Sequence, residues 1–374
     1  MKIDAIILRE LHMSLVRPFR TSFGQTSKRR VLLVEIQAEG FSGWGECTAG
    51  EHPYFSEETT DTAWLMLLQE LAPSLALNGV EHAGKCPELF RPVRGHRMAK
   101  AALENAVWDL EAQMRGISLA GLLGGMRNSI ACGVSIGIQP SVEETLESVA
   151  EELAAGYRRI KLKIKPGWDV NVLEAVRHRW PEITLSCDAN SSYRLRDADH
   201  LAAFDRFDLL MIEQPLWADD FYFHSILQKQ LETSICLDES IRNRRDALAA
   251  IGMESCRIIN LKLGRVGGFS EAIAVHNAAQ ERGIPVWCGG MLETGVGRSH
   301  NIALSTLENF SLPGDVSASR RYWAEDIVEP EVEVSAQGEI AVSSAPGRGY
   351  EVRKELVERL TVRKEKVRAL ELVS

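Results

Sequence analysis

Three short motifs, each ending an apolar run with a carboxylate, follow one another at an almost constant spacing. Asp188 ends TLSCD, Glu213 ends LLMIE and Asp238 ends SICLD. The intervals of about 25 residues match one strand–helix unit of a repeating βα array. Because parallel strands of such an array end at the same face, we expect the three carboxylates to meet at the mouth of a barrel.

Strand-like and helical patterns alternate through the middle of the chain, over residues 126–325. Helical segments separate the strands, and no GxGxxG follows any of them, which disfavours the competing doubly wound open sheet. The pattern therefore predicts an α/β fold with a (β/α)8-type barrel, a modified TIM barrel. Its eight strands are predicted near residues 131–136, 159–164, 183–188, 208–213, 234–238, 257–262, 284–288 and 312–316.

The two ends of the chain do not follow this pattern. Residues 1–125 begin with strand-like alternation and change to a helical period between Ser56 and Gly116, which predicts an α+β capping domain. The tail, 326–374, alternates again, and we expect it to return to the capping domain. Two domains also suit a chain of 374 residues, since single cores stop growing at about 250–300 residues.

Composition limits the kind of partner. A formal charge of −9 argues against nucleic acid and membrane surfaces and fits a small-molecule ligand. The seven cysteines are scattered and form no CxxC, as in reduced cytoplasmic proteins. No apolar run approaches the roughly 18 residues of a membrane span. We expect a cytoplasmic enzyme that acts on a small molecule.

Lysines accompany the carboxylates in these apolar strands. Lys161 and Lys163 lie two apart on the second predicted strand, so both point into the barrel. Lys262 ends the sixth strand. Strands two and six of a closed eight-stranded barrel lie opposite each other, so Lys163 and Lys262 should face one another across the cavity.

Three oxygen ligands from consecutive strands suit Mg²⁺, and no histidine accompanies them, which disfavours zinc. A carboxylate substrate at such a cation could lose its α-proton, because the cation stabilises the resulting enediolate. Lys161, the cation and partial desolvation should lower the pKa of Lys163 enough for it to act as the base. A Schiff-base aldolase would explain a buried lysine but not the three carboxylates.

Beyond these deductions, the chain resembles the enolase superfamily over essentially its full length. The matching segments include RIKLKIKPGWD, CDANSSY, IEQPL, LDESI, INLKLGRVGG and WCGGMLETGVGRSHN. The GGMLETGVGR stretch is similar to the o-succinylbenzoate synthase and N-succinylamino acid racemase group within the muconate-lactonising-like subgroup. Dipeptide epimerases carry an Asp-x-Asp at the eighth strand, which PGDVSAS does not supply.

The resemblance implies roles for individual residues. Lys163 and Lys262 would act from opposite faces of the substrate, with Lys161 beside them. A homo-oligomer is also implied. Asp188, Glu213 and Asp238 would bind Mg²⁺, with Mn²⁺ as a substitute, and substrate contacts would come from Ser135, Asn190, Arg265, Met291, Phe23 and Phe55.

The resemblance also implies a reaction. The first expectation is dehydration to o-succinylbenzoate in menaquinone biosynthesis, together with N-succinylamino acid racemase activity. The alternatives are a dedicated N-acylamino acid racemase and a muconate cycloisomerase. A non-catalytic barrel used for binding is a further alternative, although the acid–base residues are all present.

Overall fold

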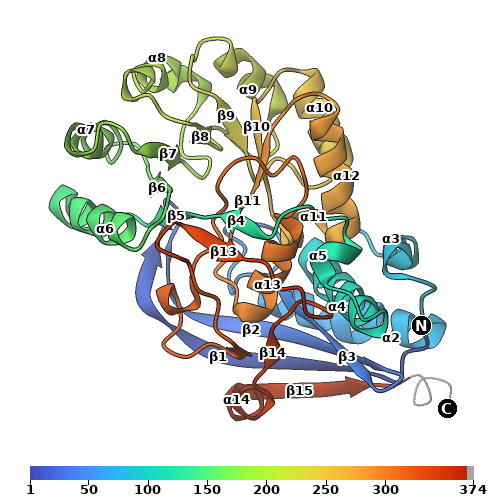
Figure 1. The fold of residues 1–374 in the computed structure, drawn as a ribbon. Helices are drawn as coiled ribbons and strands as arrows, with labels where there is room; N and C mark the ends of the chain where they lie inside the picture. Colours follow the sequence, from blue (N-terminus) through green and yellow to red (C-terminus); the bar gives the residue numbers. More distant parts are fainter. Residues whose placement is uncertain (369–374) are drawn as a thin grey trace.

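A parallel barrel forms the centre of the protein. The computed structural model describes residues 1–368, and in that range seven parallel strands form one curled sheet in the order β11-β10-β9-β8-β7-β6-β5. Figure 1 shows the helices between them on the outside of this sheet. The strands are β5 (Gly133–Ile136), β6 (Arg159–Lys163), β7 (Thr184–Asp188), β8 (Ile212–Glu213), β9 (Ile235–Leu237), β10 (Ile258–Leu261) and β11 (Val286–Cys288).

The predicted (β/α)8-type barrel is confirmed, but the prediction of its eighth strand is wrong in detail. Residues 312–316 form no strand; isolated bridges join Val286 to Phe310 and Cys132 to Gly314. The Asp315 amide also donates to the Cys288 carbonyl, at 2.8 Å. Pro313 has no N–H, so this segment cannot form a regular ladder, yet its bridges join β11 to the β5 side of the ring.

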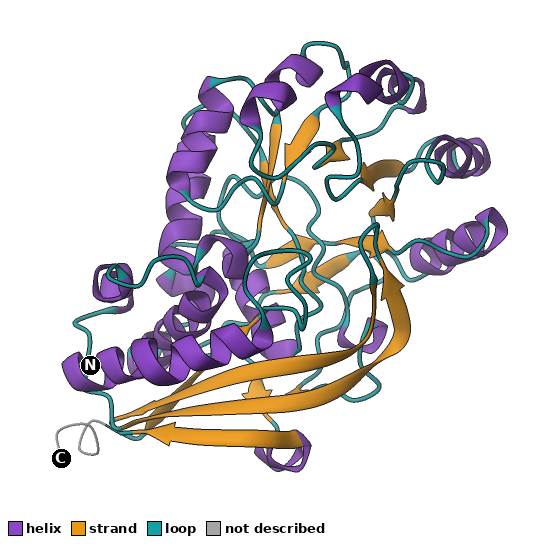
Figure 2. Cartoon of the chain, turned by 180° about the vertical axis from the view of Figure 1, so that it is seen from behind, coloured by secondary structure: helices purple, strands orange, loops and turns teal. Residues whose placement is uncertain are grey.

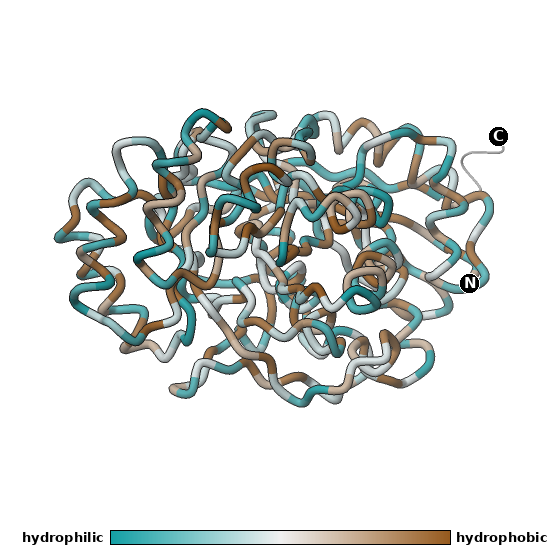
Figure 3. Tube along the Cα trace, turned by 90° about the horizontal axis from the view of Figure 1, so that it is seen from above, coloured by the Kyte–Doolittle hydropathy of each residue, from teal (hydrophilic) through white to brown (hydrophobic). Residues whose placement is uncertain are grey.

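The outer helices begin at side-chain caps, which mark where each loop ends. Ser141, Asp220 and Asn243 accept hydrogen bonds from backbone N–H groups of α6, α9 and α10, as expected for residues with short polar side chains. In Figure 3, hydrophobic and hydrophilic residues alternate along the outer turns of the trace, since one side of each helix faces the barrel. The helices are α6 (Val142–Ala154), α7 (Val170–Arg179), α8 (Ala198–Ala202), α9 (Phe221–Gln228), α10 (Arg244–Gly252), α11 (Leu263–Val266), α12 (Phe269–Gln280) and α13 (Gly295–Leu304), with short 3₁₀ turns η3 (Leu195–Asp197), η4 (Asp205–Phe207) and η5 (Ser319–Arg321).

An antiparallel sheet of long strands forms the cap, with order β15-β1-β2-β3. Figure 2 shows the longest helix, α4, lying along this sheet. Gly43 and Gly45 permit the contact, because a Cβ on either residue would lie within 2.1 Å of an α4 carbonyl oxygen. The elements are β1 (Ala5–Arg20), β2 (Gln25–Ala38), β3 (Phe41–Cys47), α1 (Thr60–Met66), η1 (Leu67–Leu71), α2 (Ala72–Asn78), η2 (Ala83–Lys85), α3 (Cys86–Phe90), α4 (Arg97–Met114), α5 (Leu119–Leu122) and β15 (Thr361–Val367).

The tail touches both parts of the molecule. β13 (Glu339–Ala341) pairs with β4 (Ser129–Ala131) beside the barrel, and β15 then pairs with β1 in the cap. The remaining elements are β12 (Val328–Glu329), β14 (Glu351–Val352) and α14 (Lys354–Leu360). β15 returns to the cap, as we expected of the tail. The division at 125/126 and 325/326 stays a proposal. Within residues 1–368, no helix is both long enough and apolar enough to cross a bilayer.

Glu104 joins the cap to the barrel from the middle of α4. Its Oε1 accepts hydrogen bonds from the Ser270 amide, at 2.7 Å, and from the Trp108 indole, at 3.2 Å. Ser270 lies in the first turn of α12, so the carboxylate sits at that helix's N-terminus. Burial raises the pKa of Glu104 to about 7, against the opposing effect of these hydrogen bonds.

This raised pKa predicts a pH-dependent stability. Between about pH 4.5 and pH 7 the folded protein retains a proton that the unfolded chain releases, so ionisation of Glu104 should lower the free energy of unfolding by about 3 kcal/mol. This loss should be absent below pH 4.5 and complete above pH 7. Urea unfolding across this range should therefore show a shallower decline for Glu104→Gln than for the wild type. The exposed Glu182→Gln serves as control, and parallel pH profiles for wild type and Glu104→Gln would contradict the assignment.

Candidate active site

One cavity of about 410 Å³ lies between the cap and the carboxyl ends of the barrel strands. Cap loops supply one wall and barrel strands the other, so both parts of the chain contribute to it. Among the predicted site residues, those on its lining are Phe23, Phe55, Ser135, Lys161, Lys163, Asn190, Lys262 and Met291.

Lys163 occupies the end of β6 and faces the end of β7. Its Nζ donates to Asp188 Oδ2 at 2.6 Å and to Asn190 Oδ1 at 2.7 Å. Asn190 has a left-handed backbone, with φ of 42°, which asparagine tolerates better than most residues. Its amide donates in turn to Glu239 Oε1 at 2.9 Å, so the orientation of its oxygen toward Lys163 is fixed.

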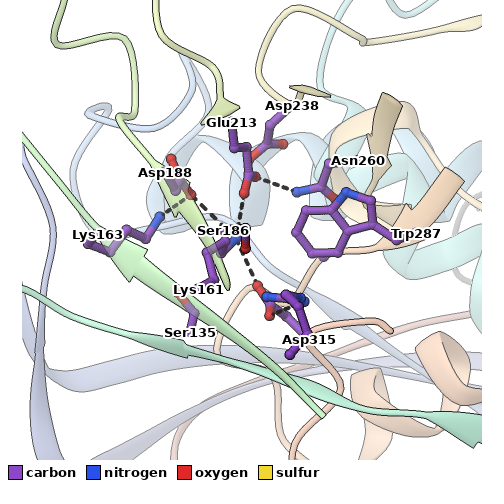
Figure 4. A network of polar contacts seen from close by, with 12 residues as sticks. Ser135, Lys161, Lys163, Ser186, Asp188, Glu213, Asp238, Asn260, Trp287 and Asp315 are labelled. Carbon is purple, nitrogen blue, oxygen red and sulfur yellow. Dashed lines mark hydrogen bonds and ion pairs between the residues drawn. The ribbon is translucent and has the colours of Figure 1, made fainter. Parts of the chain in front are cut away.

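Lys161 lies deeper in the barrel, among three carboxylates (Figure 4). Its Nζ is 2.6 Å from Glu213, 2.8 Å from Asp315 and 3.4 Å from Asp188. The ammonium also lies over the Trp287 ring, 4.6 Å from its centroid. Burial alone would lower the pKa of Lys161, but Asp315, Glu213 and Asp188 together raise it well above the ordinary lysine value. Lys161 is therefore a fixed positive charge.

Lys262 reaches the cavity from the end of β10. Three strands, β7, β8 and β9, separate β10 from β6 in the sheet, which places Lys262 and Lys163 on opposite sides of a curled barrel. Lys262 Nζ donates to Asp238 Oδ2 at 2.7 Å and lies 4.6 Å from the centroid of the Phe55 ring. The order of these strands in the sheet is the one that the strand count predicted.

Arg265 lies behind Lys262 and not on the main cavity; it lines a smaller adjoining pocket. Its guanidinium pairs with Asp238, and its Nε donates to the Ile241 carbonyl at 2.7 Å. Burial lowers the pKa of Arg265 to about 9, opposed by Glu213. Arg265 would therefore influence a substrate in the main cavity indirectly, through Asp238 or Lys262.

The three predicted ligand carboxylates are each paired with a cation. Lys163 pairs with Asp188, Lys161 with Glu213, and Lys262 with Asp238. Burial would raise the pKa of Asp188, but Lys163 and Lys161 hold it well below its usual range. In this arrangement the described residues contain no group of three or more His, Cys, Asp or Glu side chains placed to share a metal ion.

The chemistry of the cluster nevertheless suits a divalent cation. The donors are hard oxygens without sulfur or imidazole, as Mg²⁺ prefers. Glu239 adds a fourth carboxylate, whose Oε2 is shielded from solvent and has no hydrogen-bond partner among the residues that the structure describes. Burial, followed by the charges of Asp188 and Glu213, raises the pKa of Glu239. Within the described residues, the cluster thus has a carboxylate oxygen, Glu239 Oε2, that accepts no hydrogen bond, and a cation would use such an oxygen.

Sequence reasoning missed several residues of the site. Asp315 pairs with Lys161 and with Arg159, at 2.7 Å, and Asn260 donates to Glu213 at 2.6 Å. Both could have been found: Asp315 lies near the end of the predicted eighth strand, 312–316, and Asn260 lies two residues before Lys262, on the same face of the strand. Glu239 gave no such signal, because it simply follows Asp238.

A capped parallel barrel with opposed lysines and strand-end carboxylates defines an enolase-like class of protein. Comparison with known families agrees: residues 2–124 match the mandelate racemase/muconate lactonizing enzyme N-terminal domain, and residues 144–356 match the enolase C-terminal domain-like family. The chain belongs to the mandelate racemase/muconate lactonizing enzyme family of the enolase superfamily.

Relatives that bear two different names are similar to this chain. The chain is 54% identical to an o-succinylbenzoate synthase of Geobacillus kaustophilus, over 96% of both chains. It is 46% identical to an N-succinylamino acid racemase of Amycolatopsis, over 97% of this chain and 99% of the relative. A solved enolase-superfamily structure from Listeria innocua superimposes with a TM-score of 0.94 at 43% identity, covering 99% of this chain and 100% of that one.

The buried pairing of Asp315 predicts a large effect on stability. Replacing Asp315 by Asn removes the negative charge that Arg159 and Lys161 share, and it should lower the free energy of unfolding by roughly 3–5 kcal/mol. Chemical denaturation measures the loss. Glu151→Gln, which breaks an exposed pair with Arg17, is the control and should change stability by less than about 1 kcal/mol. Equal effects of the two substitutions would contradict the pairing.

Proposed function

We propose that the protein removes the proton α to a substrate carboxylate, acting as an o-succinylbenzoate synthase that also racemises N-succinylamino acids. One observation carries this proposal: Lys163 and Lys262 line the same cavity from strands on opposite sides of the barrel. Relatives at 45–54% and at 46% identity that bear the two names support it.

The proposal includes a divalent cation, Mg²⁺ with Mn²⁺ as a substitute, held by Asp188, Glu213 and Asp238. When bound, such an ion would neutralise the substrate carboxylate and stabilise the charge that develops after proton loss. The ammonium groups of Lys163 and Lys262 currently occupy two of these carboxylates. Competition for the carboxylates would release both lysines toward the substrate.

In the synthase reaction, Lys163 would take the α-proton. The C–O bond to the leaving hydroxyl then breaks, and Lys163 returns its proton to that hydroxyl. The hydroxyl thus leaves as water, from the same face that lost the α-proton. Lys262 would remain charged and stabilise the anion from the opposite side. Asn190 keeps the Lys163 amine directed at the cavity.

In the racemase reaction, each lysine would serve one enantiomer. Either lysine takes the proton from its own face, and the opposite one delivers a proton to the other face. Lys161 would hold the carboxylates in place as a permanent charge. Arg265 would act on Lys262 through Asp238, to which both are bonded.

The cavity lining would orient the rest of the substrate. Ser135 carries a buried hydroxyl with no partner among the described residues, and Met291 and Phe23 add apolar surface. Phe55 would cover the Lys262 side. The likeness to muconate lactonizing enzymes, at 21% identity, shows the fold alone and does not favour that reaction.

Exchange of the α-proton with solvent tests the roles of the two lysines. In D₂O with Mg²⁺, Lys163→Ala should lower exchange of one enantiomer of N-succinylphenylalanine by about 10²–10⁴-fold, because its base is lost. The other enantiomer, served by Lys262, should still exchange. NMR measures both rates, and Lys165→Ala, outside the cavity lining, is the control.

Two outcomes would contradict the proposal. Exchange of both enantiomers at the wild-type rate in Lys163→Ala would exclude Lys163 as the base. Failure of the wild type, with Mg²⁺, to turn over either the synthase substrate or N-succinylamino acids would exclude the substrate assignment.

A further inference from the structure

Arg29 is a buried cation in the cavity wall and has no anionic partner within residues 1–368. It lies on β2 of the cap, its side chain is part of the cavity lining, and the residue is 8% exposed. Its one side-chain hydrogen bond among the described residues runs from Nη2 to the Thr48 carbonyl, at 3.3 Å. Its Nε is shielded from solvent and has no partner in the described part of the chain.

The adjacent residue of the same strand, Arg30, has a guanidinium that is paired with carboxylates. Arg30 donates to Glu10 at 2.7 Å and to Asp61 at 2.6 Å. Within residues 1–368, no carboxylate oxygen lies within 4 Å of the Arg29 guanidinium. Arg29 therefore forms no ion pair with the described residues. Burying an arginine in this way is unfavourable unless its donors find acceptors.

The two carboxylates that act electrostatically on Arg29 accept hydrogen bonds from other groups. Glu46 accepts from the Thr294 hydroxyl at 2.6 Å and from the Gly297 amide at 3.0 Å. Glu293 accepts from Asn301 at 2.9 Å and from the Met291 amide at 2.8 Å. Burial lowers the pKa of Arg29, and Glu46 and Glu293 oppose that shift from a distance. They therefore favour the charged guanidinium without satisfying its donors.

Thr48 supplies a second unsatisfied group at the same place. Its Oγ1 is buried and has no hydrogen-bond partner among residues 1–368, and Thr48 also lines the cavity. A Cβ on Gly264 would lie 2.1 Å from this Oγ1, so Thr48 packs directly against the residue two positions after Lys262. Arg29 and Thr48 therefore belong to the Lys262 side of the cavity.

We propose that Arg29 and Thr48 form a subsite for a second, distal carboxylate of the substrate. This inference rests on the proposed function, because a succinyl group carries such a carboxylate at its far end. A guanidinium and a hydroxyl offer donors to both carboxylate oxygens, and a charge-assisted contact of this kind is among the stronger hydrogen bonds. The subsite selects dianionic over monoanionic acyl substrates.

A pair of substrates isolates the contact. N-succinylphenylalanine and N-butyrylphenylalanine have acyl chains of equal length, but only the first ends in a carboxylate. Arg29→Met should lower kcat/KM for the succinyl substrate by about 10–100-fold, mainly through KM, because a hydrogen bond to a charged group is lost. For the butyryl substrate the change should stay within about twofold, since it makes no such contact.

Matched variants keep the test decisive. Thr48→Val should lower kcat/KM for the succinyl substrate alone, by about 3–10-fold, and provides the test if Arg29→Met does not fold. Arg29→Lys, which keeps the charge, should recover part of the loss. The exposed Arg196→Met is the control. Equal losses on both substrates, or no loss on the succinyl substrate, would overturn the subsite.

Failure of the proposed function would look different. If the wild type turns over neither N-acylphenylalanine, the racemase assignment is wrong. Calorimetric binding of the same two compounds to wild type and Arg29→Met then decides the subsite alone. Tighter binding of the succinyl compound that is lost in Arg29→Met supports it, and equal binding of both compounds to the wild type overturns it.

Discussion

The structure depends on the pairing of charges buried at the carboxyl ends of the barrel strands. Lys161 is central to it, since one ammonium links Glu213, Asp315 and Asp188 from three different strands or loops. Buried charges of this kind are tolerated only when they are paired. The pairing therefore fixes the relative positions of β6, β7, β8 and the irregular eighth segment, and with them the geometry of the cavity.

The same pairing explains how the site could change its bonding without changing its shape. Lys163 and Lys262 are tied to carboxylates at the two sides of the cavity, while Lys161 remains enclosed. A cation that competes for Asp188 and Asp238 would free the outer lysines and leave the inner one in place. The cap completes this chamber, and Glu104 on α4 holds it against the barrel at the start of α12.

Much of the fold and of the candidate site could be predicted from the sequence, because strand ends that carry a charge after an apolar run are a local signal. Asp188, Glu213 and Asp238 carry this signal, and Lys161, Lys163 and Lys262 lie in or directly after neighbouring strands. The eighth strand was wrong because Pro313 interrupts the ladder, and Asp315 was missed with it. Arg29 and Thr48 could not be found in this way, because their surroundings arise only when the cap docks on the barrel.

The central claim is that two amines approach one substrate carbon from opposite faces. A crystal structure of the protein with Mg²⁺ and bound N-succinylphenylalanine tests it most directly. We expect the Lys163 and Lys262 amines on either side of the α-carbon, with Asp188, Glu213 and Asp238 around a single ion. Both amines on one face, or an ion bound by other residues, would contradict the account.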